Sequence, residues 1–127
     1  MEPSARALQQ SAGLRPHIIV YKIVPAPLWR ESERAGTFHG SPADVRDGFI
    51  HLSRAEQIGG TAARHFADVA DLLLIAVREE SLDIRWGPSR GGELFPHLYG
   101  ALPMTSVAWA RALPLIDGVH VLPNLAP

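Results

Sequence analysis

The stretch Gly48-Phe49-Ile50-His51-Leu52-Ser53 carries an apolar run into a histidine and then into a helix-like pattern. The run predicts a strand over residues 49–52, in which His51 and Phe49 share one face because neighbouring side chains alternate. The helix that follows would present unpaired N–H groups and partial positive charge at its start, which favour phosphates and carboxylates. We therefore expect a functional site at this junction of strand and helix.

Ser53 and Glu56 have the spacing of a capping box, a serine followed three residues later by a glutamate, which predicts a helix over residues 54–67. Two glycines, Gly59 and Gly60, fall in the middle of this helix, and each costs about 1 kcal/mol relative to alanine. The helix is therefore expected either to break there or to pass close to other backbone.

The remaining elements are predicted from apolar periodicity and from turn residues. Residues 71–78, DLLLIAVR, give the strongest strand signal and are expected at the centre of a sheet. Further strands are predicted over residues 17–24, 83–86, 107–113 and 119–122, a helix over 27–35 and a helical turn over 42–45, whereas the apolar segment 94–100 is interrupted by Pro96. Five to seven strands with two helices, the helices early, predict an α+β fold with a mainly antiparallel sheet.

Size and composition are typical of one domain, because 127 residues that are 46% hydrophobic can fill a single core. Residues 1–16 are polar and rich in alanine, and are predicted to form a loose extension before a domain over residues 17–127. The 12 basic and 13 acidic residues leave a net charge of -1, which argues against a broad surface for nucleic acid or membrane.

Absent residue types and motifs narrow the chemistry. The chain has no cysteine, which excludes disulfides and thiolate-bound metals. Its longest apolar run, residues 72–77, is too short to cross a membrane, and residues 1–16 lack the apolar core of a signal peptide, so we expect a cytoplasmic protein. The six histidines lack HExxH or HxH spacing, so no metal site is predicted, and P-loop, GxGxxG and GxSxG motifs are absent.

His51 is the first candidate for chemistry, as a ring in a cleft that hydrogen-bonds a ligand or transfers a proton. The alternative, equally open, is a half-buried histidine that serves only the fold. Ser53 could cap the following helix, contact a ligand or do both.

Further candidates are spread along the chain. His97 and Tyr99 are two residues apart in the segment FPHLYG, so both would face one cleft if that segment is extended, although Tyr99 could also pack in the core. Lys22, the only lysine, could bind phosphate or lie at a sheet edge with its ammonium in water. Glu93 is the candidate acid or base on a loop, with a solvated surface charge as the alternative.

Three segments together resemble the bacterial domain of unknown function 952: Tyr21-Lys22-Ile23, GFIHLS at residues 48–53 and FPHLYG at residues 95–100. The resemblance covers roughly residues 18–113. It implies an ADP-ribosyltransferase-like fold, in which a split antiparallel sheet holds NAD in a cleft. The chain is also distantly similar to RNA 2′-phosphotransferases, which use this fold on NAD. By this likeness Lys22 and His51 would line the nucleotide cleft.

Two positions depart from those patterns. Lys22 stands where the phosphotransferases carry a histidine followed by glycine, and Gly87 follows Trp86 where the family commonly has glutamate. If that missing carboxylate takes part in chemistry, Glu93 would have to replace it.

The resemblance leads to two functional hypotheses. In the first, the cleft binds NAD or another ADP-ribose-containing or phosphorylated ligand, and the domain is a transferase. Its catalytic residues would be His51, Glu93 and His97, and its ligand-binding residues Lys22, Ser53 and Tyr99. In the second, the domain is a non-catalytic module that binds a small molecule. A third interpretation leaves both histidines in the core, without function. NAD is the candidate substrate or ligand, and no cofactor is established.

Overall fold

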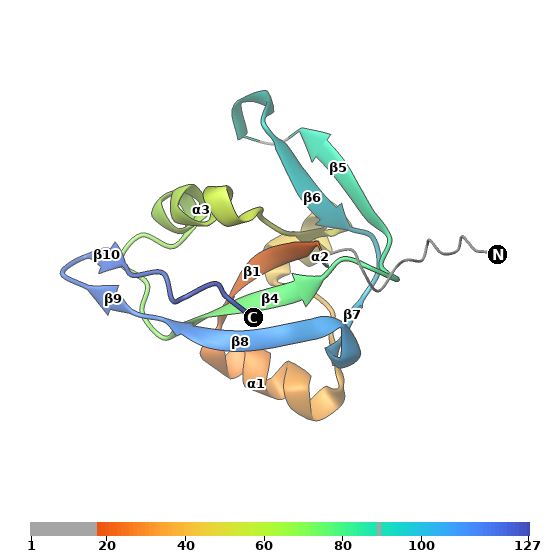
Figure 1. Ribbon diagram of the computed structural model, residues 1–127, viewed down its shortest axis with the longest axis horizontal. Helices are drawn as coiled ribbons and strands as arrows, with labels where there is room; N and C mark the ends of the chain where they lie inside the picture. Colours follow the sequence, from red (N-terminus) through yellow and green to blue (C-terminus); the bar gives the residue numbers. More distant parts are fainter. Residues whose placement is uncertain (1–17, 89) are drawn as a thin grey trace.

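The computed structural model describes residues 18–88 and 90–127, so the predicted extension over residues 1–16 lies outside the described part of the chain. One three-stranded antiparallel sheet forms its centre (Figure 1). In this sheet β4 (Leu72–Arg78) lies between β1 (Ile19–Pro25) and β8 (Val107–Leu113). The central place predicted for the most apolar segment is therefore confirmed.

A second three-stranded antiparallel sheet has the order β3 (Ile50–His51), β6 (Leu94–Leu98) and β5 (Ile84–Pro88). The prediction that Pro96 interrupts this apolar segment is wrong, because Pro96 lies inside β6. Its carbonyl accepts a hydrogen bond of 3.0 Å from the N–H of Leu52. Pro96 lacks only a backbone N–H, so the strand loses a single hydrogen bond and can accommodate the proline.

The two sheets are joined at one point, where Tyr21 of β1 pairs with Ser53, just after β3. Each residue donates its N–H to the other's carbonyl over 2.8 Å. The pairing ends there, and the rest of this edge of β1 continues without a neighbouring strand among the described residues. A split between the sheets therefore opens beside β1.

Three α-helices are present in the described residues, instead of the two predicted: α1 (Ala26–Ala35), α2 (Pro42–Asp47) and α3 (Ile58–His65). α1 ends as predicted at Gly36, which adopts a left-handed conformation with φ of 86°. α2 is longer than the predicted single turn because Ser41 and Asp44 form a capping box, with Pro42 in the first turn.

The predicted capping box of Ser53 and Glu56 is wrong. The chain first makes a 3₁₀ turn, η3 (Ala55–Gln57), in which the side chain of Gln57 accepts a 2.9 Å hydrogen bond from the N–H of Arg54. The capping box is therefore formed one residue later, by Arg54 and Gln57. The hydroxyl of Ser53 instead contacts the hydroxyl of Thr61 at 3.2 Å. α3 starts after η3 and continues through the two glycines without a break.

Short strand pairs account for the remaining strands. β2 (Thr37–Phe38) pairs with β7 (Leu102–Pro103), and β9 (Leu115–Ile116) pairs with β10 (Val119–His120). The described residues contain ten strands, above the predicted five to seven. β10 falls within the strand predicted over residues 119–122, whereas β2, β7 and β9 were not predicted, because strands of two residues leave no periodic pattern in the sequence. Two more 3₁₀ turns are η4 (Arg90–Gly92) and η5 (Met104–Ser106).

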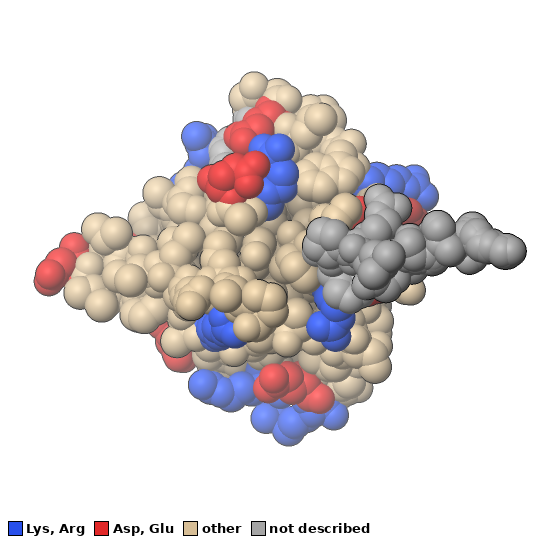
Figure 2. All heavy atoms as spheres, in the orientation of Figure 1, with Lys and Arg blue, Asp and Glu red and all other residues tan. Residues whose placement is uncertain are grey.

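Apolar side chains form two clusters. One contains Trp29 of α1 with Phe38, Leu98 and Leu102, and the other contains Ile58 of α3 with Leu74 and Leu113. The helices α1 and α3 therefore bury apolar surface of the central sheet in separate clusters (Figure 1). No helix in the described part of the chain is long and apolar enough to cross a membrane. On the face shown in Figure 2, described basic and acidic side chains are interspersed, without an extended basic patch.

Candidate functional site

A cavity of about 560 Å³ lies beside the free edge of β1, between α2, the end of β3 and α3. Pockets of roughly 300–1,000 Å³ accommodate small-molecule ligands. Its apolar walls include Leu28, Phe66 and Phe95. Its polar walls include Lys22, Asp44, Asp47, His51, Ser53, Thr61 and His97. The cavity is therefore a mostly apolar hollow with charged groups gathered at α2 and β3.

Four of the six residues predicted for the site line this cavity: Lys22, His51, Ser53 and His97. They come from separate parts of the chain and are brought together because β1, β3 and β6 meet where the two sheets join. His51 and His97 are directly opposite each other in the pairing of β3 with β6. Phe49 shares a face with His51, as the alternation predicted, and their ring centres are 4.6 Å apart.

The other two predicted residues, Tyr99 and Glu93, lie outside the lining of this cavity. Tyr99 is 41% exposed, and its ring lies 5.4 Å from Phe49 and beneath the guanidinium of Arg85. The carboxylate of Glu93 accepts hydrogen bonds from the side chains of Gln57 at 3.0 Å and Arg54 at 3.2 Å. These contacts attach the β5–β6 hairpin to η3.

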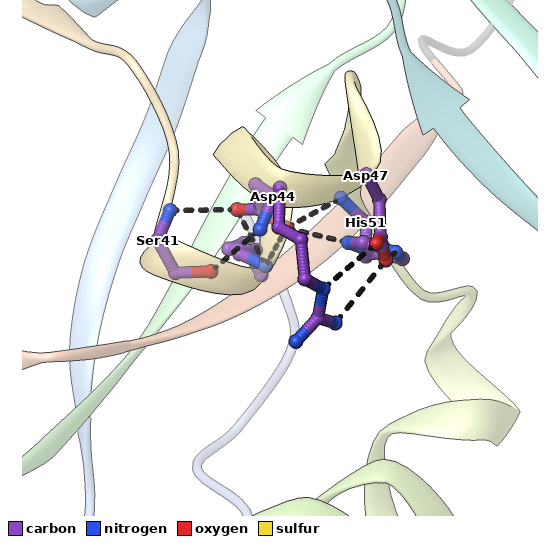
Figure 3. A network of polar contacts seen from close by, with 6 residues as sticks. Ser41, Asp44, Asp47 and His51 are labelled. Atoms are coloured by element: carbon purple, nitrogen blue, oxygen red, sulfur yellow. Dashed lines mark hydrogen bonds and ion pairs between the residues drawn. The ribbon is translucent and has the colours of Figure 1, made fainter.

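The centre of the polar network is Asp44, a residue that sequence reasoning did not select. Its carboxylate is 1% exposed and accepts from Lys22 Nζ at 3.0 Å, the N–H of Ser41 at 2.8 Å, and both the N–H and Nδ1 of His51 at 3.1 and 2.6 Å (Figure 3). The capping box turns Asp44 back over the start of α2, and Gly48, with φ of 87°, returns the chain so that His51 reaches it. The S-x-x-D spacing of Ser41 and Asp44 was the signal that could have revealed this residue.

Burial and pairing act in opposite directions on these charges. Burial alone would raise the pKa of Asp44, but the hydrogen bond from His51, the charge of Lys22 and the two backbone N–H groups outweigh it. The pKa of Asp44 is therefore held well below its usual value, and the carboxylate is ionised. Burial lowers the pKa of Lys22, and Asp44 opposes that shift.

The ammonium of Lys22 therefore does not extend into free solvent, which was one of the two predicted positions. It is buried and already paired with Asp44.

His51 lies between two carboxylates. Its Nδ1 contacts Asp44, and its Nε2 lies 3.0 Å from Oδ2 of Asp47. Both nitrogens can donate only when the imidazole carries both protons. Asp47 also accepts from Arg46, whose Nε lies 3.0 Å from Oδ1, and both residues line the cavity.

His97 has the opposite character, because its ring is buried and lacks a carboxylate partner among the described residues. Burial, and secondarily the charge of His51, lowers the pKa of His97. The ring stacks on Phe49 with centres 4.1 Å apart, and its Nε2 has no hydrogen-bond partner in the described part of the chain. A Cβ at Gly87 would lie 3.1 Å from this ring, so the glycine leaves His97 its space.

Backbone groups of β1 add a further polar element. The N–H of Glu79 donates to the carbonyl of Ile18, and the backbone hydrogen bonds of successive strand residues alternate between the two edges of the strand. The even-numbered residues of β1 therefore bond to β4, whereas Tyr21 bonds to Ser53 at the other edge. The backbone N–H and C=O of Ile23 point to the same edge of β1 as those of Tyr21, because this direction alternates from one strand residue to the next. Its N–H and C=O have no hydrogen-bond partner among the described residues, and Ile23 lines the cavity.

The described residues contain no group of three or more potential metal ligands in a binding arrangement. The charged groups of the site instead pair with one another. The arrangement is suited to binding a small ligand that combines a flat apolar part with hydrogen-bonding and anionic groups.

Comparisons with known proteins identify the family. The model of a family described as a protein of unknown function (DUF952) matches residues 23–110, and the chain belongs to this family. The crystal structure of protein CC0527 from Caulobacter crescentus is similar, with a TM-score of 0.76 and 43% identity, covering 81% of this chain and 93% of that one. A solution NMR structure of CC0527 gives a TM-score of 0.73 and 45% identity, covering 80% and 90%. Among curated proteins no sequence matches.

Proposed function

We propose that this member of the family has an ADP-ribosyltransferase-like fold and binds NAD, or another ADP-ribose-containing or phosphorylated ligand, in the cavity beside β1. The observation that carries the proposal is the set of polar groups without partners that lies beside the apolar walls of the cavity. The backbone N–H and C=O of Ile23 and the Nε2 of His97 lack partners among the described residues. Buried polar groups without partners cost free energy, and a bound ligand can supply those partners.

The free edge at Ile23 favours a particular ligand group. The N–H and C=O of one extended residue point in the same direction, as a donor beside an acceptor. A primary carboxamide presents the complementary pair, an acceptor beside a donor. The apolar walls formed by Leu28, Phe66 and Phe95 suit the flat ring that carries such a carboxamide in nicotinamide.

The charged groups favour binding over catalysis. Lys22 is paired with Asp44, and the two ring nitrogens of His51 contact Asp44 and Asp47, so neither side chain is a free nucleophile or base. Glu93, the candidate acid or base, is hydrogen-bonded to Gln57 outside the cavity lining. We therefore place ligand binding first.

One observation favours transferase activity as the second candidate. The lowered pKa of His97 keeps its ring neutral near neutral pH, and its Nε2 is unpaired. A neutral imidazole in a cavity wall can exchange a proton with a ligand. His97, rather than Glu93, would then be the group that moves the proton.

Thermal unfolding in the presence of NAD, ADP-ribose and nicotinamide tests the proposal. A ligand at one hundred times its Kd adds about 2.7 kcal/mol to the free energy of unfolding. We expect NAD to raise Tm, His51→Ala to abolish the rise, and His120→Ala, on β10 and outside the cavity lining, to retain it. Nicotinic acid should bind more weakly than nicotinamide, because a carboxylate cannot donate to the carbonyl of Ile23.

Measuring the turnover of NAD distinguishes ligand binding alone from transferase activity. Release of nicotinamide from NAD that depends on His97 would establish a transferase or hydrolase, whereas binding without release would establish a binding module. The absence of any Tm change with millimolar NAD, ADP-ribose and nicotinamide would refute the proposal.

A further inference from the structure

The carboxylate of Asp47 occupies a set of donors that is typical of an anion site. Its Oδ2 lies 3.0 Å from Nε2 of His51, and its Oδ1 lies 3.0 Å from Nε of Arg46, with Nη2 of Arg46 at 3.5 Å from Oδ2. A guanidinium fork and the N–H of a histidine ring are groups that proteins use to bind carboxylate and phosphate oxygens. The site is therefore built for an anion and holds one from its own chain (Figure 3).

The two carboxylates around His51 are held very differently. Asp44 is 1% exposed and accepts from Lys22, Ser41 and His51. Asp47 is 35% exposed, and among the described residues its contacts are with His51 and its neighbour Arg46, itself 73% exposed. Exposed ion pairs contribute little to stability. Asp44 is thus a fixed part of the fold, whereas Asp47 can be displaced.

The position of Asp47 in the chain also allows displacement. Asp47 is the last residue of α2, and Gly48 follows in a left-handed conformation. Helix ends fray at little cost, so the Asp47 side chain can turn outward without disturbing Asp44 one turn earlier. Arg46, Asp47 and His51 all line the cavity, so the vacated donors would face its contents.

We propose that Asp47 is an internal stand-in for the anionic part of the ligand, and that a phosphate group displaces it from His51 and Arg46. The inference deepens the proposed function and rests on it for the identity of the whole ligand. It assigns the phosphate end to α2 and His51, while the carboxamide end lies at Ile23. Asp47 lowers the affinity for anions because each anion must first replace a carboxylate that is already bound.

Isothermal titration with pyrophosphate at an ionic strength of about 0.15 M tests this assignment. Asp47→Asn removes the competing charge, and we expect pyrophosphate to bind several-fold more tightly, on the order of 3- to 10-fold. The matched control is Glu93→Gln, which makes the same change in net charge at an exposed carboxylate outside the cavity lining. It should change the affinity by less than about twofold, because exposed charges are screened. In the Asp47→Asn background, His51→Gln should remove the gain.

The possible outcomes separate this inference from the proposed function. Equal pyrophosphate affinity in the native chain and Asp47→Asn, or equal tightening by Glu93→Gln, overturns the inference, as does a lack of pyrophosphate binding in every variant. Tightening confined to Asp47→Asn supports it, even if NAD fails to raise Tm and the proposed function falls. Conversely, NAD that raises Tm equally in both chains supports the function and overturns the displacement of Asp47.

Discussion

Replacing Asp44 by asparagine should destabilise the fold far more than an ordinary substitution at the end of a short helix. The side chain accepts four hydrogen bonds, from Lys22, the N–H of Ser41, and two groups of His51. Asparagine keeps one accepting oxygen and turns its NH₂ group toward donors. Lys22 then remains buried without a counter-charge, and breaking a buried pair in this way costs about 3–5 kcal/mol.

The loss can be measured by urea and thermal unfolding. For a domain of this size, about 3–5 kcal/mol corresponds to a fall in Tm on the order of 10 to 20 °C. The control is Asp47→Asn, which removes an exposed carboxylate beside the same histidine and should leave Tm nearly unchanged.

A second variant tests the physical cause. Adding Lys22→Met to Asp44→Asn removes the stranded ammonium and should restore part of the lost stability. A loss below about 1 kcal/mol in Asp44→Asn, or no recovery in the double variant, would refute the view that Asp44 neutralises buried charge.

Three further outcomes are expected. The pKa of Asp44 is lower in the folded than in the unfolded chain, so its contribution to stability is complete above the unfolded pKa of about 4 and is lost as pH falls toward the folded pKa. Between pH 5 and pH 2 the free energy of unfolding, measured with urea, should therefore fall less steeply in Asp44→Asn than in the native chain. The pKa of His97, measured by NMR, should lie below 6.5, and a value at or above 6.5 would contradict its burial. Its contribution to stability is therefore complete above pH 6.5 and is lost as pH falls through the folded pKa. Gly87→Ala would place a Cβ 3.1 Å from the ring of His97 and should cost about 1–3 kcal/mol, measured by thermal unfolding, and a neutral result would mean that the ring moves freely.

The parts of the fold that could be predicted are those with a long local pattern. The seven-residue run of β4 is too apolar for any place but the centre of a sheet, and α1 ends at the glycine that can adopt a positive φ. The sharing of one face by Phe49 and His51 also follows from local alternation. Each of these features depends on residues close together in the sequence.

The missed parts depend on contacts between distant segments. Asp44 sits in a polar stretch that predicted only a turn, and its role appears when β1 brings Lys22 to it from 22 residues away. Ser53 matched a capping pattern, yet its backbone pairs with Tyr21 and so cannot start a helix there. Tyr99 and His97 were placed together by spacing, but the ring of Tyr99 packs on Phe49 and Arg85 outside the cavity lining.

We propose that the charged cluster serves ligand binding rather than stability. The pair of Lys22 and Asp44, 10% and 1% exposed, is expensive to desolvate, and well-packed apolar residues of similar volume would often be equally stable or more so. What apolar residues cannot provide is an imidazole whose Nδ1 is fixed by a buried carboxylate while its Nε2 faces a cavity rim. In this proposal Asp44 acts on the ligand through His51, by holding the ring so that Nε2 points to the position that Oδ2 of Asp47 occupies, 3.0 Å away. The surroundings of the two histidines of the β3–β6 pair also differ: His51 lies between two carboxylates, whereas the ring of His97 is buried and its Nε2 has no partner among the described residues.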